Sequence, residues 1–320
     1  MLNAVVQKVT ETITKRSQAS YAKYLDMVKA QEKLGRDRVI LTCSNIAHAA
    51  AGEENITAKK NIISGQKANI GIISAYNDML SAHCPYKLYP DEIKEAVAKD
   101  GASAQVASGV PAMCDGVTQG QVGMDMSLFS RDVIAQSVAV GLSHNVFDGA
   151  LLLGICDKVA PGLVMGAAAF AHMPIAFVPA GPMGTGISND EKTAIRQQYA
   201  AGQLDKTALQ DMECRSYHSQ GTCTFYGTAN TNQLVLEAMG LMLPGSAFVP
   251  PNTKLRHALT ECISHEIVKS TALDKTNFKP LYKVATVKNF VNGLVALLAS
   301  GVGIYLDLSG CIKKSIAKIP

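Results

Sequence analysis

The chain has 320 residues, 48% of them hydrophobic and 18% charged, with a net charge of +4. This composition fits one large or two ordinary globular domains and excludes a mostly disordered chain. The basic residues are scattered, so we expect no nucleic-acid partner. Eight cysteines are too dilute for a disulfide scaffold, and the charged start does not resemble a signal peptide. We therefore expect a cytoplasmic protein with free thiols and, because proline and glycine interrupt its uncharged windows, no membrane span.

Residues 1–65 are predicted to be a helical N-terminal segment of the same domain as the rest. The stretch Tyr21–Leu34 has the amphipathic spacing of a helix. Ser44, Asn45 and His48 follow in an alanine-rich piece. Taken alone, these three residues are typical of a helix cap with a histidine on the surface.

Residues 66–300 show short apolar strands alternating with helices. The predicted strands are Ile70–Ala75, Ala104–Val110, Leu151–Ile155 and Ile175–Val178. The predicted helices are Pro90–Lys99, Ser130–Leu142 with Ser130 as its cap, one with Pro161 in its first turn, a pair over Asn189–Glu213, Thr231–Met242, Leu255–Thr271 and one from about Val291. This alternation predicts an α/β fold, with a parallel sheet flanked by helices on both faces.

Polar residues follow three of these strands at the point where each strand ends. They are Asn77 and Asp78, then Cys114 and Asp115, then Cys156, Asp157 and Lys158. In open α/β sheets, ligands bind at the carboxyl ends of the strands. We therefore expect these side chains to face one crevice, although a chance polar ending remains the alternative at any single strand.

The cysteines of this pattern favour an iron–sulfur cluster over a zinc site. Cys114, Cys156 and Cys223 lie on separate elements, whereas the ligands of zinc fingers come in close pairs. Three thiols can hold a cluster with one iron left open as a Lewis acid. Asp115 and Asp157 carry the hard oxygen ligands that suit Mg²⁺. The pattern indicates a metal-assisted lyase; the alternative is a redox role, for which no nicotinamide or flavin motif is present.

Four motifs resemble the dihydroxy-acid/6-phosphogluconate dehydratase family, and all but the one that begins at Cys156 resemble specifically its 6-phosphogluconate branch. They are Tyr76–His83 (YNDMLSAH), Pro111–Gly120 (PAMCDGVTQG), Cys156–Lys158 followed by Pro161 and Gly162, and Gly221–Asn232 (GTCTFYGTANTN). The resemblance runs from about residue 15 to about residue 300. It implies a hydro-lyase of the Entner–Doudoroff pathway that dehydrates 6-phospho-D-gluconate, a small phosphorylated sugar acid, to 2-dehydro-3-deoxy-6-phospho-D-gluconate. It also implies a 4Fe–4S cluster, Mg²⁺ and a homodimer.

The resemblance assigns roles to individual residues. The implied cluster ligands are Cys156, Cys223 and, as the third, Cys114, although in relatives the third thiol can come from the loop after the first strand, where Cys84 lies nearby. The implied magnesium ligands are Asp115, Asp157 and Lys158, a lysine that is carbamylated in relatives and that is also our catalytic candidate. The implied substrate-binding residues are Ser44, Asn45, His48, Asn77 and Asp78.

The match is lost near residue 300, so residues 301–320 are expected to be a divergent tail, possibly encoded out of frame. Family members run to about twice this length, and their second half is a β-rich domain with a further metal carboxylate and a serine base. We therefore expect a truncated chain from which that domain is missing. The alternative function is a catalytically inactive remnant that acts at most as an interaction domain.

Overall fold

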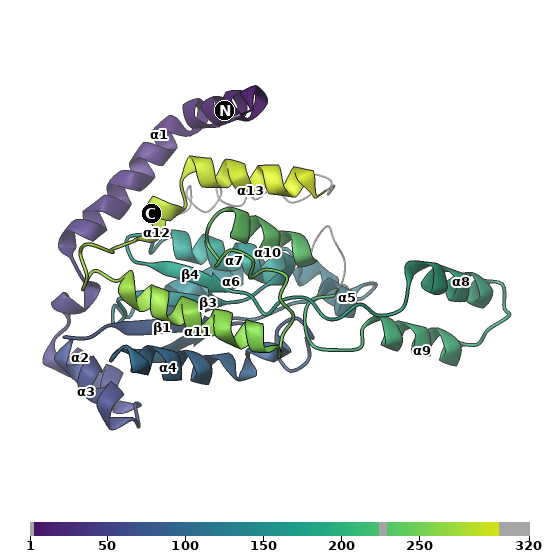
Figure 1. Ribbon diagram of the computed structural model, residues 1–320, viewed down its shortest axis with the longest axis horizontal. Helices are drawn as coiled ribbons and strands as arrows, with labels where there is room; N and C mark the ends of the chain where they lie inside the picture. The colour runs from purple at the N-terminus through teal and green to yellow at the C-terminus, as the bar shows by residue number, and fades with distance from the viewer. Residues whose placement is uncertain (1–2, 224–228, 301–320) are drawn as a thin grey trace.

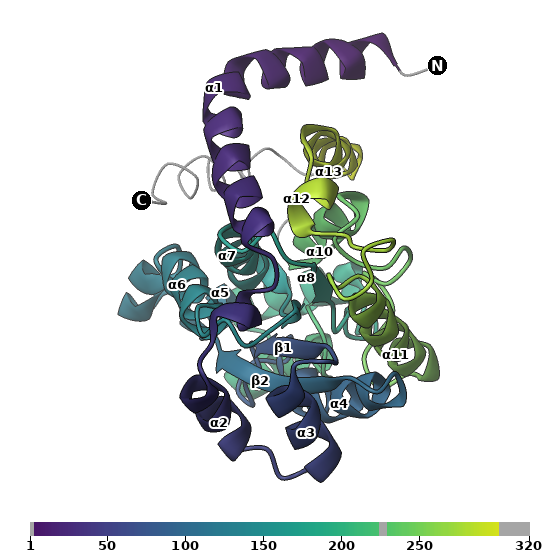
Figure 2. The ribbon, with the colours of Figure 1, turned by 90° about the vertical axis from the view of Figure 1, so that its left-hand side faces the viewer.

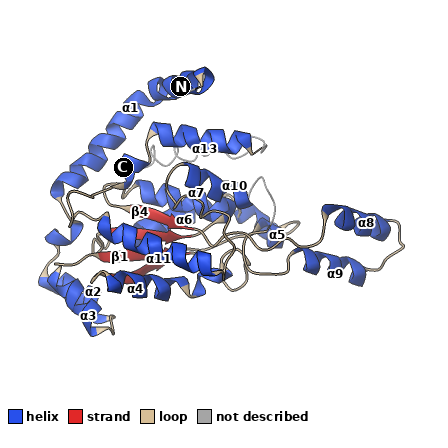
Figure 3. Cartoon of the chain, viewed as in Figure 1, coloured by secondary structure: helices blue, strands red, loops and turns tan. Residues whose placement is uncertain are grey.

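The computed structural model describes residues 3–223 and 229–300. One four-stranded sheet lies at its centre, with all neighbouring strands parallel and the order β2-β1-β3-β4 (Figures 1 and 3). The strands are β1 (Asn69–Ser74), β2 (Ser103–Gly109), β3 (Gly149–Leu153) and β4 (Ile175–Val178). The predicted α/β class and all four predicted strands are confirmed.

The two central strands are apolar along their whole length because both of their faces are covered. Every residue of β1 and β3 is buried. Successive side chains of a strand point to opposite faces, so Leu151 and Leu153 pack in one apolar cluster while Ala150 and Leu152 pack in the other. The unbroken apolar run that ends at residue 155 is therefore typical of a buried parallel strand.

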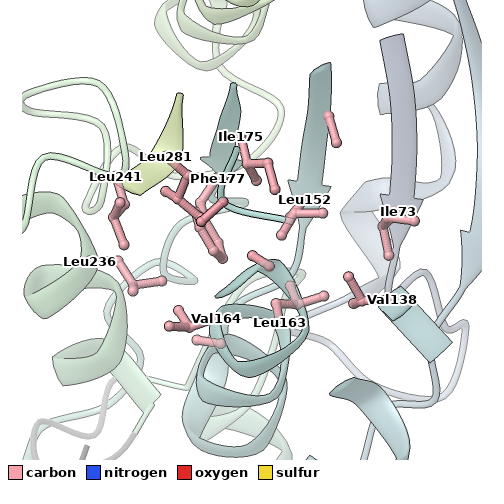
Figure 4. Packing of buried hydrophobic residues seen from close by; sticks show 14 of the residues in the cluster. Ile73, Val138, Leu152, Leu163, Val164, Ile175, Phe177, Leu236, Leu241 and Leu281 are labelled. Atoms are coloured by element: carbon pink, nitrogen blue, oxygen red, sulfur yellow. The ribbon is translucent and has the colours of Figure 1, made fainter. Parts of the chain in front are cut away.

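Helices cover both faces of this sheet, as predicted. On one face, α4 (Tyr89–Lys99) and α11 (Lys254–Lys269) contribute Ile93, Val97 and Ile263 to the cluster around β1 and β3. The other face carries α6 (Ser130–Leu142), α7 (Cys156–Ala168) and α10 (Ala229–Ala238). Figure 4 shows this second layer, in which Leu163 and Val164 of α7 lie beneath Leu152 and Phe177 of the sheet.

The start of α6 corrects one prediction. The helix begins at Ser130, but its N-cap residue is Phe129 and no side chain caps it. The Ser130 hydroxyl donates instead to the carbonyl of Ser127 at 2.6 Å. Because Phe129 already has helical dihedral angles, Ser130 lies too far inside the turn to bond to the first free N–H groups.

The start of α7 corrects a second prediction. The helix begins directly at Cys156, so Pro161 lies inside it and not in its first turn. A proline cannot donate to the carbonyl four residues earlier, which here belongs to Asp157. The Arg131 guanidinium of α6 donates to that carbonyl at 3.2 Å, and so replaces the missing bond of the helix.

Helices also form the N-terminal segment, whose α1 extends from the body of the molecule in Figures 1 and 2, and a hairpin that projects from the sheet in Figure 1. The segment comprises α1 (Ala4–Leu34), η1 (Asp37–Ile40), α2 (Cys43–Ala51) and α3 (Ile56–Ser64). A helical hairpin of α8 (Asn189–Ala200) and α9 (Lys206–Ser216) extends away from the sheet, and α12 (Leu281–Val284) and α13 (Val287–Ala299) end the described chain. Short helices near the sheet are η2 (Cys84–Lys87), α5 (Asp115–Thr118) and η3 (Val122–Met126).

One buried ion cluster ties the N-terminal segment to the amino ends of the strands. Asp148, which directly precedes β3, accepts from Arg36 Nε at 2.6 Å and from Arg38 Nη1 at 3.1 Å. Its second oxygen also accepts from the Asn69 backbone N–H at 2.9 Å. The helices before β1 are thereby fixed to the edge of the sheet.

Two predictions fall wholly or partly outside the described residues: the divergent tail at 301–320, and positions 224–228 of the loop around Cys223. The predicted division at residue 65 stays a prediction. Within the described ranges, no helix is both long enough and apolar enough to cross a lipid bilayer.

Candidate functional site

The order of the strands predicts a ligand crevice at the carboxyl ends of β1 and β3. From β1 the chain moves to β2 on one side, and it returns to β3 on the other side of β1. Ligands of open α/β sheets bind where the strand order reverses in this way. The chain segments that leave β1 and β3 at this point carry Asn77 and Cys156, as the sequence predicted.

Three predicted residues meet at this edge in one ion cluster. The Lys158 ammonium lies 2.6 Å from Asp115 Oδ2 and 2.5 Å from Asp157 Oδ2. Lys158 is only 3% exposed, and Ser127 donates to the other oxygen of Asp115 at 2.7 Å. Asp115 comes from α5 and the other two from the first turn of α7, so the fold brings two separate strand ends onto one cation.

The two carboxylates keep Lys158 charged. Burial lowers the pKa of this amine, but its hydrogen bonds to Asp115 and Asp157 outweigh burial and raise the pKa above its ordinary value. An ammonium thus occupies the point where two carboxylates converge. Paired carboxylate oxygens are also what Mg²⁺ takes as ligands, so the donor set at this point fits the predicted metal.

Cys156 has a strained backbone at the junction of β3 and α7. Its φ is +77°, in the left-handed region that residues other than glycine rarely adopt and that costs about 1–3 kcal/mol. The turn is tight, since a Cβ added at Gly154 would lie 2.4 Å from Val159 Cγ1 and 2.6 Å from Leu163 Cδ1. Strain held by such a turn fixes the direction of the thiol.

The surroundings of Cys156 keep its thiol protonated. Burial, followed by the negative charge of Asp157, raises the pKa of this thiol well above its usual range. Its Sγ donates to Asp157 Oδ1 at 3.2 Å. A cysteine that binds iron does so as the thiolate, so occupation of this site would release a proton.

The three predicted cluster cysteines face the same region, although they do not form a closed site. Cys223 is one of the groups that raise the pKa of Cys156. Burial raises the pKa of Tyr217, and Cys223 and Cys114 are among the neighbours that add to this effect. In the two described ranges, no three histidine, cysteine, aspartate or glutamate side chains could together hold a metal ion. The thiols suit a cluster by their chemistry, and the ligand set stays a prediction.

The backbone around Cys223 is well anchored. The Thr222 N–H donates to the Gly181 carbonyl at 3.0 Å, and the Met183 N–H donates back to Thr222 at 2.9 Å. The buried Asn230 side chain donates to the Cys223 carbonyl at 2.9 Å. The alternative third ligand is also close, because Gln220 of the same loop donates to Cys84 Sγ at 3.3 Å.

The predicted substrate residues divide into two groups. Asn77 and Asp78 directly follow β1 at the crevice. Asn77 Oδ1 accepts from the Met79 N–H at 2.8 Å, and Asp78 accepts from the Tyr76 hydroxyl. This bond, together with a smaller effect of burial, raises the pKa of Tyr76 to about 12.

The second group lies elsewhere. Ser44, Asn45 and His48 are exposed residues of α2, which lies at the opposite end of the sheet from α5 (Figure 1). Asn45 forms a capping box with Thr42 at the start of the helix. The structure therefore shows the helix cap with a surface histidine that the sequence allowed, and it does not bring these residues to the crevice.

Sequence reasoning missed four supporting residues. They are Ser127, Arg131, Asn230 and His83, whose Nε2 lies 3.0 Å from the Ile155 carbonyl. Burial lowers the pKa of His83 to about 4, and the Ile155 carbonyl and Asp157 oppose this only in part. Two signals were available in the sequence. His83 and Asn230 lie inside family-like motifs, and Pro161 leaves the Asp157 carbonyl, which Arg131 binds, without its helical partner.

Comparisons with known proteins identify the family of the chain. Residues 67–303 match the family described as dihydroxy-acid/6-phosphogluconate dehydratase N-terminal. The chain belongs to this dehydratase family. It is 51% identical to the phosphogluconate dehydratase of Zymomonas mobilis over 300 residues, which cover 94% of this chain and 49% of that relative.

Two further relatives show the same pattern. Identity is 51% over 302 residues with the phosphogluconate dehydratase of Escherichia coli K12, with 94% and 49% of the two chains covered. It is 32% over 242 residues with the dihydroxy-acid dehydratase of Lachnoclostridium phytofermentans, with 73% and 42% covered. The recognition of the family from its motifs is confirmed. The chain spans about half the length of the curated relatives it matches.

Proposed function

We propose that this chain carries the metal-binding half of a hydro-lyase that converts 6-phospho-D-gluconate to 2-dehydro-3-deoxy-6-phospho-D-gluconate in the Entner–Doudoroff pathway. The observation that carries the proposal is the convergence of Asp115, Asp157 and Lys158 beside the Cys156 thiol at the strand ends. Relatives named phosphogluconate dehydratase, 51% identical over nearly the whole chain, supply the substrate. A cytoplasmic homodimer is part of the proposal.

In this proposal Cys156 and Cys223, with Cys114 as the third ligand, would hold a 4Fe–4S cluster, while Asp115, Asp157 and, once its amine is carbamylated, Lys158 would hold Mg²⁺. A bound cluster with an open iron supplies a Lewis acid that helps a hydroxyl leave as water. Asp157 joins the two sites, because one of its oxygens accepts from the Cys156 thiol and the other from Lys158.

The remaining steps belong to the side chains themselves. Lys158 is the catalytic candidate because it lies at the centre of the carboxylate pair, where it holds a proton while it is an ammonium. Asn77 and Asp78 border the crevice after β1 and can bind hydroxyl groups of a sugar acid by hydrogen bonds. Ser44, Asn45 and His48 would reach the same substrate only from a second copy or after a rearrangement, since α2 lies at the far end of the sheet.

Anaerobic reconstitution with iron and sulfide tests the proposal. The purified chain should gain the visible absorbance of a cluster and bound iron, and it should then form a 2-keto acid from 6-phosphogluconate when Mg²⁺ is present. Cys156→Ser should abolish both signals. Cys262→Ser, at an exposed cysteine of α11, is the matched control and should change neither. Normal iron content in Cys156→Ser would refute the ligand assignment.

A second candidate function is an inactive remnant that acts as an interaction domain. It is favoured by the exposed apolar side chains Val122, Leu128 and Phe129 that follow Asp115 in the chain. The same reconstitution separates the two candidates. A chain that binds iron but releases no 2-keto acid supports the remnant, and steady formation of product excludes it.

A further inference from the structure

We propose that His83 is a positioning residue for Cys156, which it holds in its left-handed conformation by binding the carbonyl of Ile155. The proposal rests on the proposed function only in treating Cys156 as a ligand. It concerns the backbone conformation of Cys156, and it gives a role to His83, a buried side chain outside the ion cluster.

The first argument is the geometry of the Ile155–Cys156 peptide. Rotation of this peptide plane changes ψ of Ile155 and φ of Cys156 together, so a bond to its carbonyl oxygen fixes both angles. His83 Nε2 lies 3.0 Å from that oxygen. A carbonyl oxygen only accepts, so Nε2 carries the hydrogen. The +77° φ of Cys156 is thus coupled directly to the His83 ring.

The second argument comes from the other helices. The N-cap carbonyls of α2 and α8 accept from the backbone N–H four residues later, since Thr42 accepts from Ile46 and Ser188 accepts from Lys192. The N-cap residue of α7 is Ile155, and its carbonyl is bound by a side chain, the ring of His83. The strained start of this helix thus has a partner from outside the helix.

The third argument is that packing alone does not explain a histidine at position 83. The residue is 1% exposed, and its Nδ1 is buried without a hydrogen-bond partner in the described part of the chain. An unsatisfied buried nitrogen destabilises the fold, so an apolar residue would pack better here. The single bond to the Ile155 carbonyl distinguishes the histidine from such a residue.

His83 is also rigid enough to act as a support. It directly precedes η2 (Cys84–Lys87), and its ring lies against Tyr86, with the two ring centroids 6.1 Å apart. Tyr86 is fully buried, and its hydroxyl donates to the Val178 carbonyl at the end of β4 at 2.8 Å. The support therefore runs from β4 through Tyr86 and His83 to the turn that carries Cys156.

Three substitutions separate the hydrogen bond from the volume of the ring. His83→Gln places an amide N–H near the position of Nε2, whereas His83→Leu fills the space without a donor. His83→Asn keeps an amide that is one methylene too short to reach the carbonyl, and it serves if the leucine variant fails to fold. The matched control is His144→Leu, which removes a 3.1 Å contact between a ring and the Gly141 carbonyl at the end of α6.

The measurement is the rate at which iodoacetamide alkylates Cys156 in the metal-free chain, followed by peptide mass spectrometry. The exposed Cys43 and Cys262 are internal references. Release of the strained turn in His83→Leu or His83→Asn should change the Cys156 rate by about fivefold or more. His83→Gln and His144→Leu should stay within about twofold of the parent chain. A rate within twofold of the parent in folded His83→Leu and His83→Asn overturns the proposal.

Iron content after reconstitution distinguishes this proposal from the proposed function. If the parent chain binds a cluster, His83→Leu should retain less iron than His83→Gln, and equal retention counts against the positioning role. If the parent chain binds no iron while the alkylation rates differ as expected, the cluster assignment fails and the positioning role of His83 stands.

Discussion

The two edges of the sheet carry ion clusters of opposite design. At the amino edge one carboxylate, Asp148, lies between the guanidiniums of Arg36 and Arg38, and its side chain is 1% exposed. At the carboxyl edge one ammonium, Lys158, lies between two carboxylates, and the Asp115 side chain is 34% exposed. The first cluster is closed and carries surplus positive charge, whereas the second is open and carries surplus negative charge.

We interpret the first as a structural cluster and the second as the candidate binding cluster. Both Asp148 oxygens have partners, which include a backbone N–H of β1, so the amino-edge cluster links the N-terminal segment to the sheet. The open cluster has an exposed carboxylate that can exchange its ammonium partner for another cation. The predictions below test this contrast, in order of decreasing effect.

Asp148→Asn should give the largest loss of stability. It leaves the buried guanidinium of Arg38 and the half-buried guanidinium of Arg36 without a counter-charge, which costs about 3–5 kcal/mol of the free energy of unfolding. Denaturant unfolding measures the loss. Asp91→Asn is the control, because that side chain is 75% exposed and lies 3.8 Å from Lys94, and it should cost less than about 0.5 kcal/mol. A loss as small as that of the control would show that the amino edge is not a structural cluster.

Acid should lower the free energy of unfolding through His83, which lies near the carboxyl edge of the sheet. Its pKa falls from 6.5 to about 4 on folding, so the unfolded chain takes up the proton first. Protonation of this ring does not affect the free energy of unfolding above pH 6.5. As the pH falls from 6.5 to 4, the free energy of unfolding should decrease by about 3 kcal/mol, at 1.36 kcal/mol per pKa unit. Unfolding of the parent chain and of His83→Gln across this range measures the difference. Parallel pH profiles would contradict it.

Lys158→Met should destabilise the chain less than Asp148→Asn does. The two carboxylates lose their cation, but Asp115 keeps contact with water, so we expect a loss of about 1–3 kcal/mol. In the chain without carbamylation the Lys158 ammonium competes with Mg²⁺ for Asp115 and Asp157. Mg²⁺ should therefore restore part of the loss in Lys158→Met and raise its melting temperature more than that of the uncarbamylated parent. Lys269→Met, at an exposed surface pair, should show neither effect. An absence of magnesium response in Lys158→Met would argue against a cation site.

The smallest effect is expected at the break in α7. Arg131→Met removes the bond to the Asp157 carbonyl and should cost about 1 kcal/mol. Pro161→Ala provides a backbone N–H for the same carbonyl, so in the double variant the loss from Arg131→Met should shrink. A double-mutant cycle of unfolding free energies measures this coupling. Additive losses would show that the guanidinium does not replace the helical bond.

The sequence predicted the local elements well and the spatial relations only in part. Strands and helices depend on nearby residues, and the apolar run of β3 followed by a polar triplet was enough to single out the candidate site. The order β2-β1-β3-β4 depends on which strands pair, which no local pattern records. The exact start of a helix likewise depends on how the chain enters it. For this reason the N-cap of α6 is Phe129 and not Ser130, and Pro161 lies inside α7 and not in its first turn.

The candidate site shows the same limit. Motifs selected Asp115, Asp157 and Lys158 correctly as neighbours, because all three follow strands that end at one edge. The family-like segment around Ser44 was assigned to the same site, yet α2 lies at the other end of the sheet. Support from His83 was not visible, because the ring and the carbonyl it binds are separated by 72 positions in the chain.

The hairpin of α8 and α9 implies an uneven pattern of amide hydrogen exchange. Helix α8 has no buried residue, and the two helices are joined by exposed pairs such as Arg196 with Glu213. Short helices are marginal alone, and exposed ion pairs add little. The hairpin can therefore open while the sheet stays intact, and its amides should exchange far faster than those of β3, whose residues are all buried.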